Sequence, residues 1–182
     1  MKFTLITEFK PALTFLVKFV VIYLVGNVLY GLFVTYYYPE ADPVTQLVTD
    51  QSSGLLQLFG FDTEVVRNAS KPHVALVLDG RAIISVYEGC NGLNVMIIFA
   101  AFLAAFGPVA KRTFYFWLAG TLAIHAFNLI RVIVLFWIAW EYPSRFYFLH
   151  KYFFTASLYM VVFILWYLWL VPLRMEFKKQ DG

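Results

Sequence analysis

The residues of this chain that could do chemistry are one thiol, one guanidinium and one imidazole. The only cysteine, Cys90, lies in SVYEGCNGLNVMIIF (residues 85–99), where a polar segment gives way to an apolar run. Arg131 interrupts a second apolar run, and His150 stands at the start of a third. A thiolate is a nucleophile that forms more readily beside a cation, and a histidine can accept and return its proton. An arginine keeps its charge at ordinary pH, so its role must be electrostatic. The set predicts acyl-transfer chemistry.

Each of these residues also has a reading without catalysis. A lone cysteine is often a small buried hydrophobe, an interfacial histidine often anchors a helix, and Arg131 could extend toward lipid headgroups. Asn128, one helical turn before Arg131, favours a polar site that faces a helix bundle. Glu88, two residues before the cysteine, is either a solvated loop charge or a partner for Arg131.

Composition identifies lipid as the solvent for most of the chain. Of its 182 residues, 62% are hydrophobic and 14% are charged, whereas about a quarter are charged in a typical soluble domain. A single cysteine excludes an internal disulfide and a thiolate zinc cluster. No metal and no organic cofactor is expected. The net charge of +3 is small and the basic residues are scattered, so we expect no nucleic-acid partner.

Four apolar stretches are predicted to cross the membrane, at about residues 19–38, 91–108, 114–140 and 153–172. The second is the weakest candidate because its uninterrupted apolar run is the shortest. Lysines and arginines gather before the first stretch, between the second and third, and after the fourth, which predicts that both termini are cytoplasmic. The first stretch is read as an uncleaved helix, because no small-x-small cleavage site follows it.

This orientation places a large segment, about residues 39–88, outside the cytoplasm. It is predicted to contain an amphipathic helix at the membrane surface, broken near residues 52–54. A β-hairpin should follow, because Asp79-Gly80 joins two runs rich in Val and Ile and suits a type I′ turn. The predicted fold is an all-α integral membrane protein with these outer elements, in a single domain of residues 1–182. It puts the thiol, guanidinium and imidazole on the outer side at similar depth.

The order of the motifs resembles a known family. EGCNGLN, followed by NLIRV in the next helix and by a histidine at the start of the last, is similar to the exosortase/archaeosortase family of polytopic membrane cysteine transpeptidases. The resemblance covers residues 87–171 and is closest to the short exosortase F type. It implies that Cys90, Arg131 and His150 are catalytic. Cys90 would form a thioester, His150 would act as general acid and base, and Arg131 would stabilise the thiolate or the oxyanion.

The same resemblance implies the partners and the location. The substrate would be the C-terminal sorting signal of a surface protein, which is cleaved and transferred to an acceptor nucleophile of unknown identity. Larger relatives have more spans, which implies an accessory membrane protein as a further partner beside the lipid bilayer. The location would be the inner (cytoplasmic) membrane of a bacterium, with a multi-pass chain and an active site that faces the extracytoplasmic side.

Two positions depart from the family pattern. Asn91 stands where the family commonly has serine, and Asn94 stands where it often has arginine. Both lie within about one turn of the cysteine, so we assign them, with Glu88 and Asn128, to a set of site-supporting residues. Their side chains could contact the sorting motif, so the family's substrate type does not carry over directly to this chain.

Three other functions fit parts of the sequence. A processing protease would result if water resolved the thioester. A non-catalytic assembly or transport subunit would use Arg131 and Asn128 to bind a partner helix through polar contacts. A haem-binding bundle would use His125 and His150, although these two histidines lie at different depths.

Overall fold

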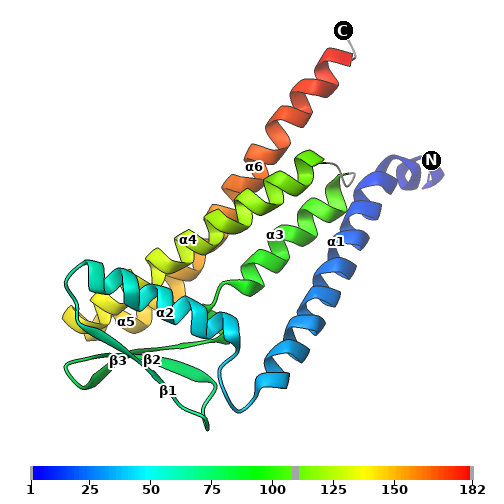
Figure 1. Ribbon diagram of the computed structural model, residues 1–182. Coiled ribbons are helices and arrows are strands. Elements are labelled where there is room, and N and C mark those ends of the chain that lie inside the picture. Colours follow the sequence, from blue (N-terminus) through cyan, green and yellow to red (C-terminus); the bar gives the residue numbers. More distant parts are fainter. Residues whose placement is uncertain (1, 108–110, 181–182) are drawn as a thin grey trace.

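The chain forms a bundle of long helices with a small outer layer at one end. The computed structural model describes residues 2–107 and 111–180. Figure 1 shows α1, α3, α4 and α6 side by side, with α2, α5 and a sheet gathered at one end of the bundle. The elements are α1 Lys2–Tyr37, α2 Pro43–Leu58, β1 Thr63–Arg67, β2 His73–Leu78, β3 Arg81–Tyr87, the 3₁₀ turn η1 Glu88–Cys90, α3 Leu93–Phe106, α4 Lys111–Glu141, α5 Pro143–Phe148, the π-helical turn η2 Leu149–Phe153 and α6 Phe154–Gln180.

The helices agree with a membrane protein. Within the described ranges, three stretches are long and apolar enough to cross a bilayer, at Phe9–Tyr37, Lys111–Glu141 and Pro143–Val171. The predicted fold class of a helical membrane protein is confirmed. The predicted span at 91–108 corresponds to α3, which has 14 residues and is therefore about 21 Å long, shorter than a hydrocarbon core of about 30 Å. Its last predicted residue, Pro108, lies outside the described residues.

The outer helix α2 is continuous, which corrects the predicted break near residues 52–54. Asp42 caps its first turn by accepting hydrogen bonds from the backbone N–H groups of Val44 and Thr45, at 2.9 and 3.0 Å. Ser52 and Ser53 are buried within the helix. The Ser53 hydroxyl lies 2.8 Å from the hydroxyl of Thr63 on β1. These small polar residues therefore permit close packing against the sheet and do not end the helix.

The predicted β-hairpin is confirmed, and it belongs to a three-stranded antiparallel sheet with the order β1-β2-β3. Asp79 and Gly80 have φ values of 50° and 73°, as both central residues of a type I′ turn require. Leu76 pairs with Ile84 while Val77 pairs with Ala82, so β3 carries one extra residue, a β-bulge. The first strand, β1, was not predicted.

Two clusters of buried apolar residues hold these layers together. The outer core joins α2, the sheet, the turn η1 and α4, and it consists of Val48, Leu56, Leu76, Leu78, Val86, Cys90, Val132 and Phe136. The bundle core joins α3, α4 and α6, and it consists of Val95, Phe99, Leu103, Ile124, Leu158, Val162 and Trp169. Cys90 therefore lies in the layer where the outer elements meet the bundle.

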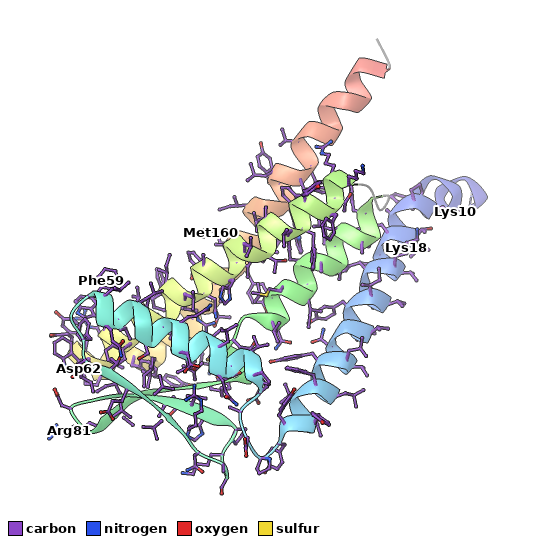
Figure 2. The ribbon with its side chains drawn as sticks, viewed as in Figure 1. Lys10, Lys18, Phe59, Asp62, Arg81 and Met160 are labelled. Atoms are coloured by element: carbon purple, nitrogen blue, oxygen red, sulfur yellow. The ribbon has the colours of Figure 1, made fainter. Side chains whose placement is uncertain are left out.

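Basic residues of α1 lie far from that layer. Figure 2 shows Lys10 and Lys18 toward the end of α1 that is remote from the sheet, whereas Asp62 and Arg81 lie at the sheet. The start of α1 and the end of α6 are both at the end of the bundle opposite the sheet (Figure 1). This arrangement brings the two ends of the chain to the same end of the bundle.

Candidate active site

Cys90 is presented by a tight turn between a strand and a helix. The strand β3 ends at Tyr87, η1 carries the cysteine, and Gly92, the N-cap residue directly before α3, has a φ of 85°. A β-carbon on Gly92 would lie 3.2 Å from the side chain of Asn128, and a β-carbon on Gly89 would lie 2.6 Å from the ring of Tyr87. Both glycines therefore allow side chains to pack directly on the backbone that carries the thiol.

The thiol and the imidazole meet, although 60 residues separate them in the sequence. The Sγ atom of Cys90 lies 3.6 Å from Nε2 of His150. Cys90 is buried, with 7% of its surface exposed. His150 lies on the π-helical turn η2, and its ring stacks on Phe146 with 5.5 Å between ring centroids. Single π turns in otherwise α-helical segments recur at functional sites, and here the turn carries the imidazole that faces the sulfur.

Asn128 and Arg131 lie on the part of α4 that faces this turn. The side-chain N–H of Asn128 donates to the backbone carbonyl of Cys90 at 3.0 Å, and its oxygen accepts from Arg131 at 3.4 Å. Both side chains are buried. They are three residues apart, so they share one helix face. Asn128 thus links the guanidinium to the cysteine turn.

The buried guanidinium of Arg131 forms no ion pair with a carboxylate of the described residues; the ion pair of Arg67 with Asp50 lies at an exposed surface. Within the same ranges, the Nε atom of Arg131 has no hydrogen-bond partner. Its charge is close enough to interact electrostatically with Tyr87 and with His150. A positive charge therefore lies beside the site, and no carboxylate in the described part of the chain pairs with it.

Glu88 and Asn94, two of the residues assigned to support the site, do not contact the thiol directly. Glu88 is half-buried, and its backbone carbonyl accepts a hydrogen bond from the hydroxyl of Tyr30 at 2.8 Å. Its carboxylate is not paired with Arg131 in the described part of the chain. Asn94 is exposed on the first turn of α3, and its side chain forms no hydrogen bond with another residue in the described part of the chain. Of these two side chains, Asn94 is the one exposed enough to meet a ligand.

Asn91 fastens the cysteine turn to two other helices. It is fully buried, and its side-chain oxygen accepts from the backbone N–H of Leu93 at 2.9 Å. Its side-chain nitrogen donates to the hydroxyls of Thr45 on α2, at 3.1 Å, and Tyr30 on α1, at 3.3 Å. Asn91 therefore supports the site from within, and its burial keeps it away from a peptide that approaches from outside.

Tyr87 is a residue of this site that the sequence analysis did not identify. The proximity of the Cys90 side chain and, after it, partial burial raise the pKa of Tyr87 above its ordinary value. The only available signal was its position three residues before the cysteine, at the end of a β-rich run. That signal is weak because aromatic residues are common in strands.

His125, the histidine within the predicted third membrane span, does not face the thiol. Nε2 of His125 is 2.7 Å from the side-chain oxygen of Gln51, on α2, whereas His150 faces the thiol. The two histidines thus have different partners. Within residues 2–107 and 111–180, no group of three or more His, Cys, Asp or Glu side chains is placed to hold a metal ion.

Comparison with known proteins identifies one family. A family model described as transmembrane exosortase matches residues 4–171 of this chain. The match covers every residue placed in the site above. No curated protein and no solved structure matches the chain significantly.

Proposed function

The chain belongs to the transmembrane exosortase family, and we propose that it is a membrane cysteine transpeptidase that cleaves the C-terminal sorting signals of surface proteins. Family membership supports a transpeptidase-type sorting function at the membrane in general. The single observation that supports the chemistry is the 3.6 Å contact between the Cys90 sulfur and His150. A nucleophile in contact with a base is the arrangement that acyl transfer requires.

The proposed reaction begins with transfer of the thiol proton from Sγ of Cys90 to Nε2 of His150. The sulfur then attacks the carbonyl carbon of the scissile peptide bond and forms a tetrahedral intermediate. When this intermediate collapses, the C–N bond breaks and His150 gives the proton to the leaving nitrogen. The N-terminal part of the substrate remains on Cys90 as a thioester. An acceptor nucleophile then gives its proton to His150 and attacks the thioester carbonyl carbon; the C–S bond breaks, and His150 returns the proton to the departing Cys90 sulfur. If water takes the acceptor's role, the same steps give hydrolysis.

Arg131 would supply the electrostatic part of this mechanism. A buried charge without a partner costs several kcal/mol, and a thiolate or an oxyanion would provide the missing negative charge. The stabilisation that one such donor gives a transition state is about 3 kcal/mol. Asn128 would fix the position of the guanidinium relative to the cysteine turn, since its side chain hydrogen-bonds to both.

The proposed orientation places the site outside the cytoplasm. The thiol packs in the core that joins the sheet to α2 and α4. The start of α1 and the end of α6 lie at the end of the bundle opposite the sheet (Figure 1). Lysines of α1 lie toward that opposite end (Figure 2), which the positive-inside rule assigns to the cytoplasm. We place the protein in the inner membrane of a bacterium, where its site would meet exported substrates.

The experiment that tests this function compares the C-termini of surface and membrane proteins by mass spectrometry. Native cells would carry either the wild-type protein or Cys90→Ser, at matched protein levels. We expect a set of proteins to keep an intact C-terminal membrane helix only with Cys90→Ser, because serine preserves size but is a far weaker nucleophile. The cleaved ends in wild-type cells would identify the motif and the acceptor.

The matched control replaces each of two histidines separately with alanine. His150→Ala should give the same uncleaved proteins as Cys90→Ser. His125→Ala should leave processing intact, because His125 contacts Gln51 and not the thiol. Identical C-termini in the wild-type and Cys90→Ser cells would reject the enzyme assignment and favour the partner-binding subunit.

A further inference from the structure

The turn that carries Cys90 is held by side chains from two helices that lie on either side of it. The backbone carbonyl of Glu88 accepts a hydrogen bond from the hydroxyl of Tyr30 on α1, at 2.8 Å. The backbone carbonyl of Cys90 accepts from the side-chain N–H of Asn128 on α4, at 3.0 Å. Figure 1 shows α3, which starts directly after this turn, between α1 and α4, and α3 packs against both. The backbone that carries the thiol is therefore fixed from two sides.

The hydroxyl of Tyr30 makes a second contact with the same turn. It accepts a hydrogen bond from the side-chain N–H of Asn91 at 3.3 Å. One hydroxyl therefore bonds to the residue two positions before the cysteine and to the residue directly after it. Tyr30 is half-buried, whereas the preceding residue of α1, Leu29, is 61% exposed. The tyrosine thus faces the turn from a helix that is largely exposed on its other side.

Other residues fasten α1 to α3. The ring of Phe15 meets the rings of Phe102 and Phe106 edge to face, with 5.6 and 5.7 Å between ring centroids. The amide of Asn27, another polar residue of α1, donates to a carbonyl of α1 itself. The hydroxyl of Tyr30 differs because it reaches the turn that carries the thiol. Packing of the two helices does not require this hydroxyl, since a phenylalanine would keep the ring.

We infer that Tyr30 is a positioning residue, whose hydroxyl holds the cysteine turn so that the sulfur of Cys90 stays in contact with His150. The inference rests on the proposed function. The sulfur and Nε2 are 3.6 Å apart, so a small shift of the turn would break their contact. A misplacement of about 1 Å can slow a reaction by about 10²-fold, even when the mutation lies away from the reacting atoms. Tyr30 acts through Glu88 and Asn91, which makes α1 a part of the site.

The test uses Tyr30→Phe, which keeps the ring and removes only the hydroxyl. Tyr23→Phe, two turns earlier on α1, is the matched control, because the ring of Tyr23 stacks on Phe19. The first readout is the rate at which the C-termini of surface proteins are processed in native cells, at matched protein levels. We expect Tyr30→Phe to slow processing by about 10-fold to 10²-fold and Tyr23→Phe to leave it unchanged.

The second readout needs no substrate and shows whether the hydroxyl acts through His150. Methyl methanethiosulfonate, a small reagent that modifies thiolates, would react with Cys90, the only cysteine, in the purified full-length protein in detergent. We expect Tyr30→Phe to slow this reaction about 10-fold at neutral pH, because a thiol that loses its base forms less thiolate. In a His150→Ala background the base is already absent, so Tyr30→Phe should have no further effect. A role in stability alone would not depend on His150.

The outcomes separate this inference from the proposed function. Wild-type processing by Tyr30→Phe, or a thiol reaction that is unchanged or that slows equally with and without His150, would overturn the inference. The melting temperature of Tyr30→Phe in detergent should stay within a few degrees of the wild-type value, and a large drop would assign the hydroxyl a structural role instead. If Cys90→Ser leaves all C-termini unchanged, the proposed function fails, whereas the thiol reaction still decides whether the hydroxyl places the sulfur against His150.

Discussion

At the scale of single residues, the buried guanidinium of Arg131 is a costly group. Among the described residues it has one hydrogen bond, to Asn128, and its Nε has no partner. Replacing a buried ionic group with an apolar side chain of similar volume is often neutral or stabilising. A residue kept for structure would not leave its charge unpaired, whereas a residue kept to stabilise a transient anion would.

This reasoning gives a prediction for Arg131→Met. We expect processing to fall by about 10²-fold to 10³-fold, because the charge that faces the anion is lost. The melting temperature in detergent should stay the same or rise. Arg81→Met, at an exposed position of the hairpin, is the control and should change neither quantity. A clear loss of thermal stability with Arg131→Met would assign the guanidinium a structural role instead.

At the scale of elements, the site depends on how closely α3 approaches α4. The helix α3 starts directly after the cysteine turn, and α4 carries Asn128. A β-carbon on Gly120 of α4 would lie 2.3 Å from the ring of Phe99 on α3. Phe99 is fully buried in the bundle core, so its ring has little room to move. The spacing of these two helices is thus set by a glycine.

We expect Gly120→Ala to destabilise the protein by about 1–3 kcal/mol, the usual cost of overpacking a core. Thermal unfolding in detergent would measure the change. Gly31→Ala on α1 is the matched control, because the added carbon would have no atom within 4 Å apart from its chain neighbours and the backbone of its own helix, and alanine has a higher helix propensity than glycine. Equal stability of both variants would show that Phe99 moves freely and that the helix spacing is not fixed in this way.

At the scale of the whole molecule, the arrangement of the ends predicts a topology. The two chain ends lie at one end of the bundle and the sheet at the other (Figure 1). In a Cys90→Ser background, a cysteine introduced at Asp79, in the exposed hairpin turn, should react with a membrane-impermeant maleimide in intact spheroplasts. Labelling that appears only after permeabilisation would invert the proposed orientation.

Local sequence patterns were sufficient to predict most of the helices and the hairpin. They could not predict contacts between residues that are distant in the sequence. Asp79-Gly80 was sufficient for the hairpin, because the turn type is set by those two residues. The strand β1, TEVVR, was missed because it is short, has charged residues and is recognised only through its pairing with β2. The break expected near residues 52–54 was wrong because small residues also mark close packing.

The same distinction applies to the site. The residue types and the topology placed the thiol, the guanidinium and the imidazole on one side of the membrane. Asn91 is buried among groups from α1 and α2 through packing across more than 40 residues of sequence. No local sequence pattern predicts this contact. The packing of the Tyr87 ring on Gly89, beside the cysteine, arises from the turn of the backbone after β3, so it too required the folded chain.

The most direct measurement of the central claim is chemical capture of the thioester on Cys90. Hydroxylamine attacks thioesters and would leave a hydroxamate on the new C-terminus of the cleaved substrate. We expect mass spectrometry of hydroxylamine-treated native membranes to find truncated surface proteins that end in a hydroxamate, present with the wild-type protein and absent with Cys90→Ser. Truncated proteins that are equally abundant with Cys90→Ser, or that never carry the hydroxamate, would contradict a thioester at this cysteine.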